Sequence, residues 1–181
     1  MFDKLIDLIV TFIGDFLPFK IVDQWEMGVH LRFGKYINVV QPGLNWKIPF
    51  FDQIITTPVI TQTVNLSPQT VTSEDEKSVV LTSIVRYHIH DVRKFLLGVM
   101  HANDALVDTT QGIIRDIVEG CKWADLYDLS SVVTPEINEQ VEKWGITVEQ
   151  VSFPDLGEIQ TFRIMSDSGK NFTPIIQNTQ E

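Results

Sequence analysis

The chain has 181 residues, of which 44% are hydrophobic and 21% are charged, and this composition indicates one folded domain with small additions rather than a disordered chain. It carries 14 basic and 24 acidic residues, a net charge of −10, which argues against a nucleic-acid-binding protein. A single cysteine, Cys121, excludes an intrachain disulfide and a zinc cluster built from cysteines.

The first 19 residues are the most apolar part of the chain, and their spacing predicts an amphipathic helix over residues 1–19. At about 100° per residue the apolar side chains fill one arc of roughly 200°, and polar side chains fill the remainder. Pro18 is expected to end this helix because proline lacks the backbone N–H. The residues expected to contact membrane lipid are Phe2, Leu5, Ile6, Ile9, Phe12, Ile13, Phe16 and Leu17.

Several interpretations of this segment compete. A helix of 19 residues could span about 28 Å, but Asp7 and Asp15 would then lie in or near hydrocarbon at about 2.5–3.5 kcal/mol each. A cleaved signal peptide would need a positive start and a small-residue cleavage site, and the segment has neither. The wide apolar arc favours a helix lying in the membrane interface, held by hydrophobic burial because its polar face is acidic. The remaining alternative is a helix that packs on its own domain or on a neighbouring subunit.

Residues 21–86 show the pattern of short β-strands separated by turns. Gln41-Pro42-Gly43 is a strong turn signal, and the residues behind it alternate between apolar and polar. Pro58 interrupts a β-branched run and argues for a sheet edge or a break. Residues 73–77 form a charged turn that is expected to be a solvated loop tip. A long strand follows, with an inward face predicted to contain Val79, Leu81, Val85, Tyr87 and Ile89.

Helices follow the strands. Asp91 is a suitable N-cap for a short helix, and a longer amphipathic helix is predicted over residues 103–119. Thr134 and Pro135 resemble a cap and a first helical position, so a third helix is predicted to begin there. The alternation over residues 146–153 predicts a returning strand. Antiparallel strands followed by helices indicate an α+β fold.

This order of elements, with these residues, resembles the SPFH or band 7 family, which includes stomatins, prohibitins, flotillins and bacterial regulators of the AAA membrane protease. The most specific piece is QPGLNWKIPFFD, at residues 41–52, directly behind an apolar N-terminal segment. The other matching stretches are residues 26–29, 32–35, 72–87, 105–119 and 145–148. Together the resemblance covers roughly residues 20–155.

The resemblance implies an antiparallel, β-rich SPFH-like domain with packed helices over residues 20–155, behind the membrane-anchoring helix at 1–19. Family members usually continue into a long coiled-coil helix, whereas residues 156–181 hold no sustained heptad and read as a short tail. The implied function is a non-enzymatic, membrane-associated scaffold, peripheral or monotopic. Its implied partners are membrane lipid, further copies of the chain, and a membrane protein such as a protease or channel.

No catalytic, cofactor-binding or metal-binding residues are predicted. The sequence contains no G-x-S-x-G, H-E-x-x-H, P-loop or G-x-G-x-x-G motif. His88 and His90 are expected on one strand face, but a zinc site needs three or four ligands. Asp104 and Asp108 are expected on a solvated helix face. Trp25 and Trp46 are expected either at the lipid surface or in the core.

Two further functions remain open at this point. One is a soluble assembly component whose N-terminal helix packs on a neighbouring subunit. The other is a hydrolase built around the acidic turn or around His88 and His90.

Overall fold

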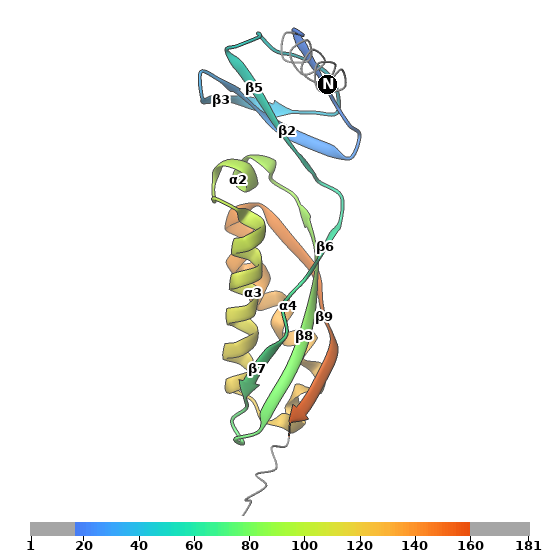
Figure 1. The fold of residues 1–181 in the computed structure, drawn as a ribbon, viewed down its shortest axis with the longest axis vertical. Coiled ribbons are helices and arrows are strands. Elements are labelled where there is room, and N and C mark those ends of the chain that lie inside the picture. The colour runs from blue at the N-terminus through green and yellow to red at the C-terminus, as the bar shows by residue number, and fades with distance from the viewer. Residues whose placement is uncertain (1–16, 160–181) are drawn as a thin grey trace, which may run out of the picture.

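The computed structural model describes residues 17–159, which form two stacked units (Figure 1). The predicted amphipathic helix, apart from its last residues, and residues 160–181 of the predicted tail lie outside this part of the chain. The fold is α+β, as predicted, and its sheets are antiparallel. Within residues 17–159 no helix is both long enough and apolar enough to cross a membrane.

The N-terminal unit consists of five strands: β1 (Phe19–Val22), β2 (Glu26–Arg32), β3 (Lys35–Val40), β4 (Gly43–Trp46) and β5 (Asp52–Pro58). Strands β3, β2 and β5 form one sheet in that order, and β1 pairs with β4 in a second. A small core of Val22, Val40 and Ile54 joins the two sheets. Pro58 stands at the end of β5, so the expected break is confirmed.

The C-terminal unit has a sheet centred on the long strand β8 (Ser78–Ile89). Strands β6 (Gln62–Asn65) and β7 (Gln69–Thr72) pair along one edge, and β9 (Ile146–Ile159) pairs along the other. Helices cover one face of this sheet (Figure 1). They are α2 (Val92–Leu97), α3 (Ala102–Glu119) and α4 (Leu129–Val141), with short 3-10 turns η1 (Trp123–Asp128) and η2 (Glu142–Trp144).

The main core lies between β8 and the helices, and it extends into the N-terminal unit. The predicted inward face of β8 is confirmed, because all five of its residues are buried. Val29 and Leu31 of β2 belong to the same cluster as Val92 and Phe95 of α2. Helix α2 therefore joins the two units, and the side chain of its N-cap, Asp91, accepts a hydrogen bond from the Lys94 N–H as predicted.

Two predicted boundaries are wrong, the start of helix α4 and the end of strand β9. Helix α4 begins at Leu129, five residues before the predicted Thr134, and Pro135 lies inside it. Hydrogen bonds between this early segment and β9 explain the difference: the Ser130 hydroxyl donates to the Val151 carbonyl, and Thr134 Oγ1 accepts from the Val151 N–H. These contacts, together with the burial of Leu129 and Val133 in the core, offset the cost of a proline in a helix, about 3 kcal/mol.

Strand β9 is also longer than predicted, since it continues past residue 153 to Ile159. Its pairing with β8 shifts register twice, and the shift between Ser152 and Asp155 breaks the apolar–polar alternation at the point where the strand was predicted to end. Residues 156–159, placed in the tail by the sequence, therefore belong to the sheet.

Candidate functional site

The two strands β1 and β4 turn an apolar face toward solvent. Their register pairs Phe19 with Trp46 and Ile21 with Leu44, which places all four side chains on one face. Ile21, Leu44 and Trp46 are between 59% and 71% exposed. The other face of the same pair carries Val22, which is buried in the small core. The alternation read from the sequence is real here, but its apolar side faces outward.

A second group of exposed aromatic side chains lies where the β2–β3 turn meets the β4–β5 loop. The Phe33 N–H donates to the Phe51 carbonyl at 2.9 Å, and the two rings lie 4.9 Å apart between centroids. Phe33, Phe50 and Phe51 are each more than half exposed. Phe33 and Phe50 have φ angles of 50° and 68°, a left-handed conformation that is rare and strained for a bulky residue.

Both groups are connected through the short segment that follows β4, and together they form what we call the apolar surface. Ile48, in this segment, is also exposed. Scattered single apolar residues are normal on protein surfaces, whereas larger groups of exposed apolar residues are typical of interaction sites. The apolar surface consists of Ile21, Phe33, Leu44, Trp46, Ile48, Phe50 and Phe51.

A covered carboxylate holds this loop in place. Asp52 accepts two hydrogen bonds from the Arg32 guanidinium, at 2.7 and 2.9 Å, and one from the Ile48 N–H at 2.8 Å. His30 Nε2 lies 2.9 Å from the same carboxylate. The hydrogen bonds from Arg32, more than those from Ile48 and His30, hold the pKa of Asp52 well below its usual range although burial opposes this. The carboxylate therefore stays ionised and fixes the loop that carries Phe50 and Phe51.

Charge is divided unevenly between the two units. Residues 17–58 contain four basic and three acidic residues, whereas residues 59–159 contain seven basic and sixteen acidic ones. Of the three acidic residues, Asp52 is covered, and Asp23 and Glu26 lie at the opposite end of β2 from Arg32. The apolar surface thus belongs to the least acidic part of the described chain.

Comparison with known proteins identifies the fold. The SPFH domain / Band 7 family matches residues 20–167 of this chain. The chain belongs to this family. The resemblance read from the sequence is thereby confirmed.

Individual relatives agree with this assignment. Protein HflK of Haemophilus influenzae is 32% identical over 165 residues, which cover 84% of this chain and 40% of that protein. Protein HflK of Vibrio cholerae is 36% identical over 105 residues, which cover 57% and 26% of the two chains. The uncharacterized protein MJ0827 of Methanocaldococcus jannaschii is 26% identical over 156 residues, covering 82% and 78%. This chain therefore spans less than half the length of the two HflK proteins.

Among the eight residues predicted to contact lipid, Leu17 alone lies within the described residues 17–159, and it is exposed. The other seven, Phe2, Leu5, Ile6, Ile9, Phe12, Ile13 and Phe16, fall outside this range. Leu17 precedes Pro18, whose carbonyl accepts the Lys47 N–H at 2.9 Å. At residues 17 and 18 the chain therefore lies directly beside β4 and the apolar surface.

Most of the apolar surface was not predicted from the sequence. Trp25 and Trp46 were expected either at the lipid surface or in the core. Both are more than half exposed, so neither fills the core. The signal that could have revealed the surface is the run Ile48-Pro49-Phe50-Phe51, which is strongly apolar in a segment predicted to turn.

The histidines and acidic residues weighed as possible catalytic or metal-binding groups lie in the C-terminal unit, away from the apolar surface. His88 and His90 do share a sheet face, but each ring has a partner on β9: His88 Nδ1 lies 2.9 Å from Glu149 Oε1, and His90 Nδ1 lies 2.9 Å from Thr147 Oγ1. In residues 17–159 no cluster of three or more potential metal-binding side chains occurs. Asp104 and Asp108 are exposed on α3, as expected.

Proposed function

We propose that this protein is a non-enzymatic, membrane-associated scaffold whose SPFH domain rests on a bilayer through the apolar surface. The observation that carries the proposal is the outward apolar face of β1 and β4. A water-soluble domain gains nothing from exposing these side chains, whereas a bilayer would cover them. The predicted anchor at residues 1–19 would lie beside this face, since the chain enters through Pro18 next to β4.

The size of the surface supports a peripheral mode of attachment. Full burial of one large apolar side chain contributes about 1.5–3 kcal/mol, so half-burying seven of them gives on the order of 5–10 kcal/mol. Loss of translational and rotational freedom costs a comparable amount, about 4–15 kcal/mol. One subunit alone would therefore bind reversibly, and subunits linked into a lateral oligomer would remain bound through avidity.

The family supports a role in organising a membrane patch or in restraining a membrane protein such as a protease or channel. Similarity to HflK over much of this chain favours that role, although the matched part is less than half of HflK. We propose the same kind of partner here, together with membrane lipid and further copies of this chain.

The second candidate function is a soluble assembly in which the same apolar surface and the N-terminal segment pack on a neighbouring subunit. It is favoured by the same exposed side chains, because a second copy could cover them as well as lipid could.

Vesicle flotation with a matched pair of variants separates the two candidates. Leu44 on the apolar surface and Val132 on α4 have similar exposed fractions, 59% and 54%. The membrane scaffold predicts that Leu44→Asp lowers flotation of the 181-residue chain and that Val132→Asp does not. The mass of the floated protein after mild detergent extraction reports the oligomer. A chain that stays soluble as an oligomer, and that Leu44→Asp dissociates, would establish the second candidate instead.

A further inference from the structure

Cationic side chains border the apolar surface. Lys47 stands between Trp46 and Ile48, and Lys35 follows the β2–β3 turn that carries Phe33. Neither lysine ammonium group has an ion-pair or hydrogen-bond partner within residues 17–159, although a lysine elsewhere in the domain, Lys77, pairs with Glu158 at 3.4 Å. These two charges are therefore available to a ligand outside the domain.

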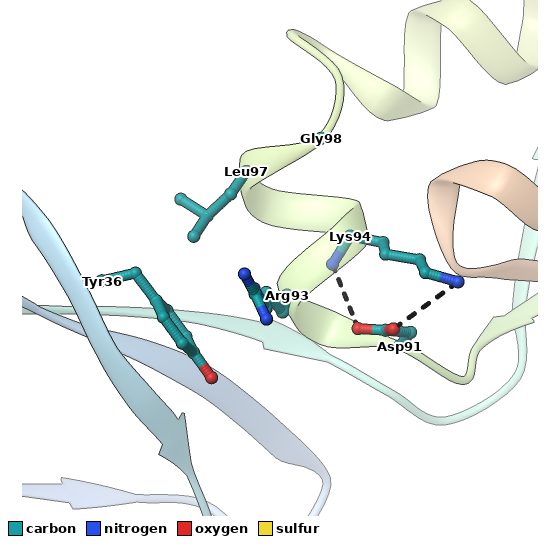
Figure 2. Close-up of a pocket in the computed structure, with 6 residues that line it drawn as sticks. All are labelled: Tyr36, Asp91, Arg93, Lys94, Leu97 and Gly98. Atoms are coloured by element: carbon teal, nitrogen blue, oxygen red, sulfur yellow. Dashed lines mark hydrogen bonds and ion pairs between the residues drawn. The ribbon is translucent and has the colours of Figure 1, made fainter.

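A third cation lies in the cleft between β3 and α2 (Figure 2). This cleft has a volume of about 440 Å³. The Arg93 guanidinium carbon lies 4.6 Å from the centre of the Tyr36 ring, and Figure 2 shows the side chain beside that ring, with Leu97 above. Lys94 turns the other way, toward Asp91, with 3.9 Å between Nζ and Oδ2.

Stacking holds Arg93 without using its hydrogen-bond donors. A guanidinium stacked on an aromatic ring keeps its N–H groups in the plane, where they can donate to a phosphate oxygen. In the described part of the chain no acceptor takes a hydrogen bond from the Arg93 side chain. The nearest carboxylate among the residues lining the cleft, Asp91, is paired with Lys94. Arg93 is thus an oriented cation whose N–H donors are not used within the described part of the chain.

The cleft lies at a height that suits a lipid headgroup. Tyr36 is three residues from Phe33, so their Cα atoms are at most about 11 Å apart. The headgroup layer on each side of a bilayer is roughly 5–8 Å thick. If Phe33 reaches the edge of the hydrocarbon, the Tyr36 Cα lies at most about 11 Å above that edge, and the Arg93 guanidinium, 4.6 Å from the Tyr36 ring, is placed toward the phosphate layer. Lys35 lies between Tyr36 and the β2–β3 turn in the chain, so its backbone is closer than that of Tyr36 to Phe33.

We infer that the SPFH domain recognises anionic phospholipid headgroups through Lys35, Lys47 and Arg93. This inference rests on the proposed membrane function and adds a lipid class to it. The predicted helix at residues 1–19 cannot supply such recognition, because its polar face is acidic. The strongly acidic unit at residues 59–159 would be repelled by the same lipids, which would orient the domain with the apolar surface toward the bilayer.

The test compares vesicles of phosphatidylcholine alone with vesicles that also contain phosphatidylglycerol. Binding of the whole 181-residue chain is measured over a range of lipid concentrations. We expect tighter binding to the phosphatidylglycerol vesicles, and we expect high salt to remove the difference because it shortens the screening length from about 10 Å to about 3 Å. A basic side chain near an anionic surface contributes about fivefold in affinity, so replacing all three cations by glutamine should cost about a hundredfold.

The matched control replaces Arg86, Arg115 and Lys122 by glutamine, which also removes three positive charges, but from positions in the C-terminal unit that do not line the cleft. It should retain the preference, and circular dichroism should show that both triple variants are folded. Equal binding of the unaltered chain to both kinds of vesicle would overturn the inference and leave the membrane function standing. Equal losses in the two triple variants would overturn the assignment to these residues. Binding to neither vesicle would overturn the proposed function as well.

Discussion

Replacing Trp46 by alanine should weaken membrane binding strongly while lowering the stability of the fold only modestly. A tryptophan can bury about 150–250 Å², and 71% of this side chain is exposed, so roughly 110–180 Å² is available to lipid. At about 25 cal/mol per Å², complete coverage would contribute about 3–4 kcal/mol. Since an interface covers a side chain only in part and alanine keeps some contact, we expect a loss of about 2 kcal/mol, or about 30-fold in affinity.

The loss of folding stability should be small because Trp46 packs on little of the domain. Its ring makes an edge contact with Phe19 at 6.3 Å, which is worth about 0.5–1.5 kcal/mol. Tyr127→Ala is the control, since Tyr127 is an aromatic residue of η1 that is 90% exposed and remote from the apolar surface. Flotation over a range of lipid concentrations measures the binding, and thermal unfolding measures the stability. Equal vesicle affinity of the Trp46 and Tyr127 variants would refute a lipid-facing role for β4.

Three further predictions concern the core, a turn and a carboxylate. Ile114→Ala removes a fully buried side chain of α3 and should lower the free energy of unfolding by about 2–5 kcal/mol in urea titrations. Gly145→Ala places a Cβ 2.3 Å from the Asp91 carbonyl oxygen at a φ of 76° and should lower the free energy of unfolding by at least about 2 kcal/mol. Gly157→Ala, with open space around it, should change the free energy of unfolding by less than about 0.5 kcal/mol in the same assay. Because Arg32 lowers the pKa of Asp52 in the folded state, the ionised carboxylate stabilises the fold at neutral pH, and this stabilisation is lost as the pH falls below the ordinary carboxyl pKa of about 3.9. Thermal melts from neutral to acidic pH should therefore show a flatter pH dependence for Asp52→Asn than for the unaltered chain, and parallel curves would count against this role.

The central part of the fold could be predicted from the sequence because local pattern and tertiary packing agree there. Strand β8 alternates regularly, and the residues on its apolar side are the ones that the helices bury. Helix α3, at Ala102–Glu119, differs by one residue from the range that its spacing predicts. The cap at Asp91 was also predictable, because its side chain bonds within its own helix and depends on no distant partner.

Other features depend on residues far away in the chain. The start of α4 follows from hydrogen bonds to β9, which override the local Thr-Pro signal at residues 134 and 135. Alternation over residues 44–48 shows which side chains share a face, but it cannot show which face the rest of the domain covers. Pairing with β1 and packing around Val22 determine which face is covered. The sequence of β4 alone therefore cannot distinguish an outward apolar face from an inward one.

Quenching of single tryptophans by brominated lipid tests most directly whether the apolar surface meets the bilayer. One variant keeps Trp46 alone and the other keeps Trp25 alone, with phenylalanine at the remaining tryptophan positions. Trp25 is also exposed, but its carbonyl accepts the Val59 N–H where the chain leaves for the C-terminal unit. We predict that bound vesicles with brominated acyl chains quench Trp46 and leave Trp25 almost unchanged. Strong quenching of Trp25 with Trp46 unaffected, in protein that floats with the vesicles, would contradict the proposed orientation.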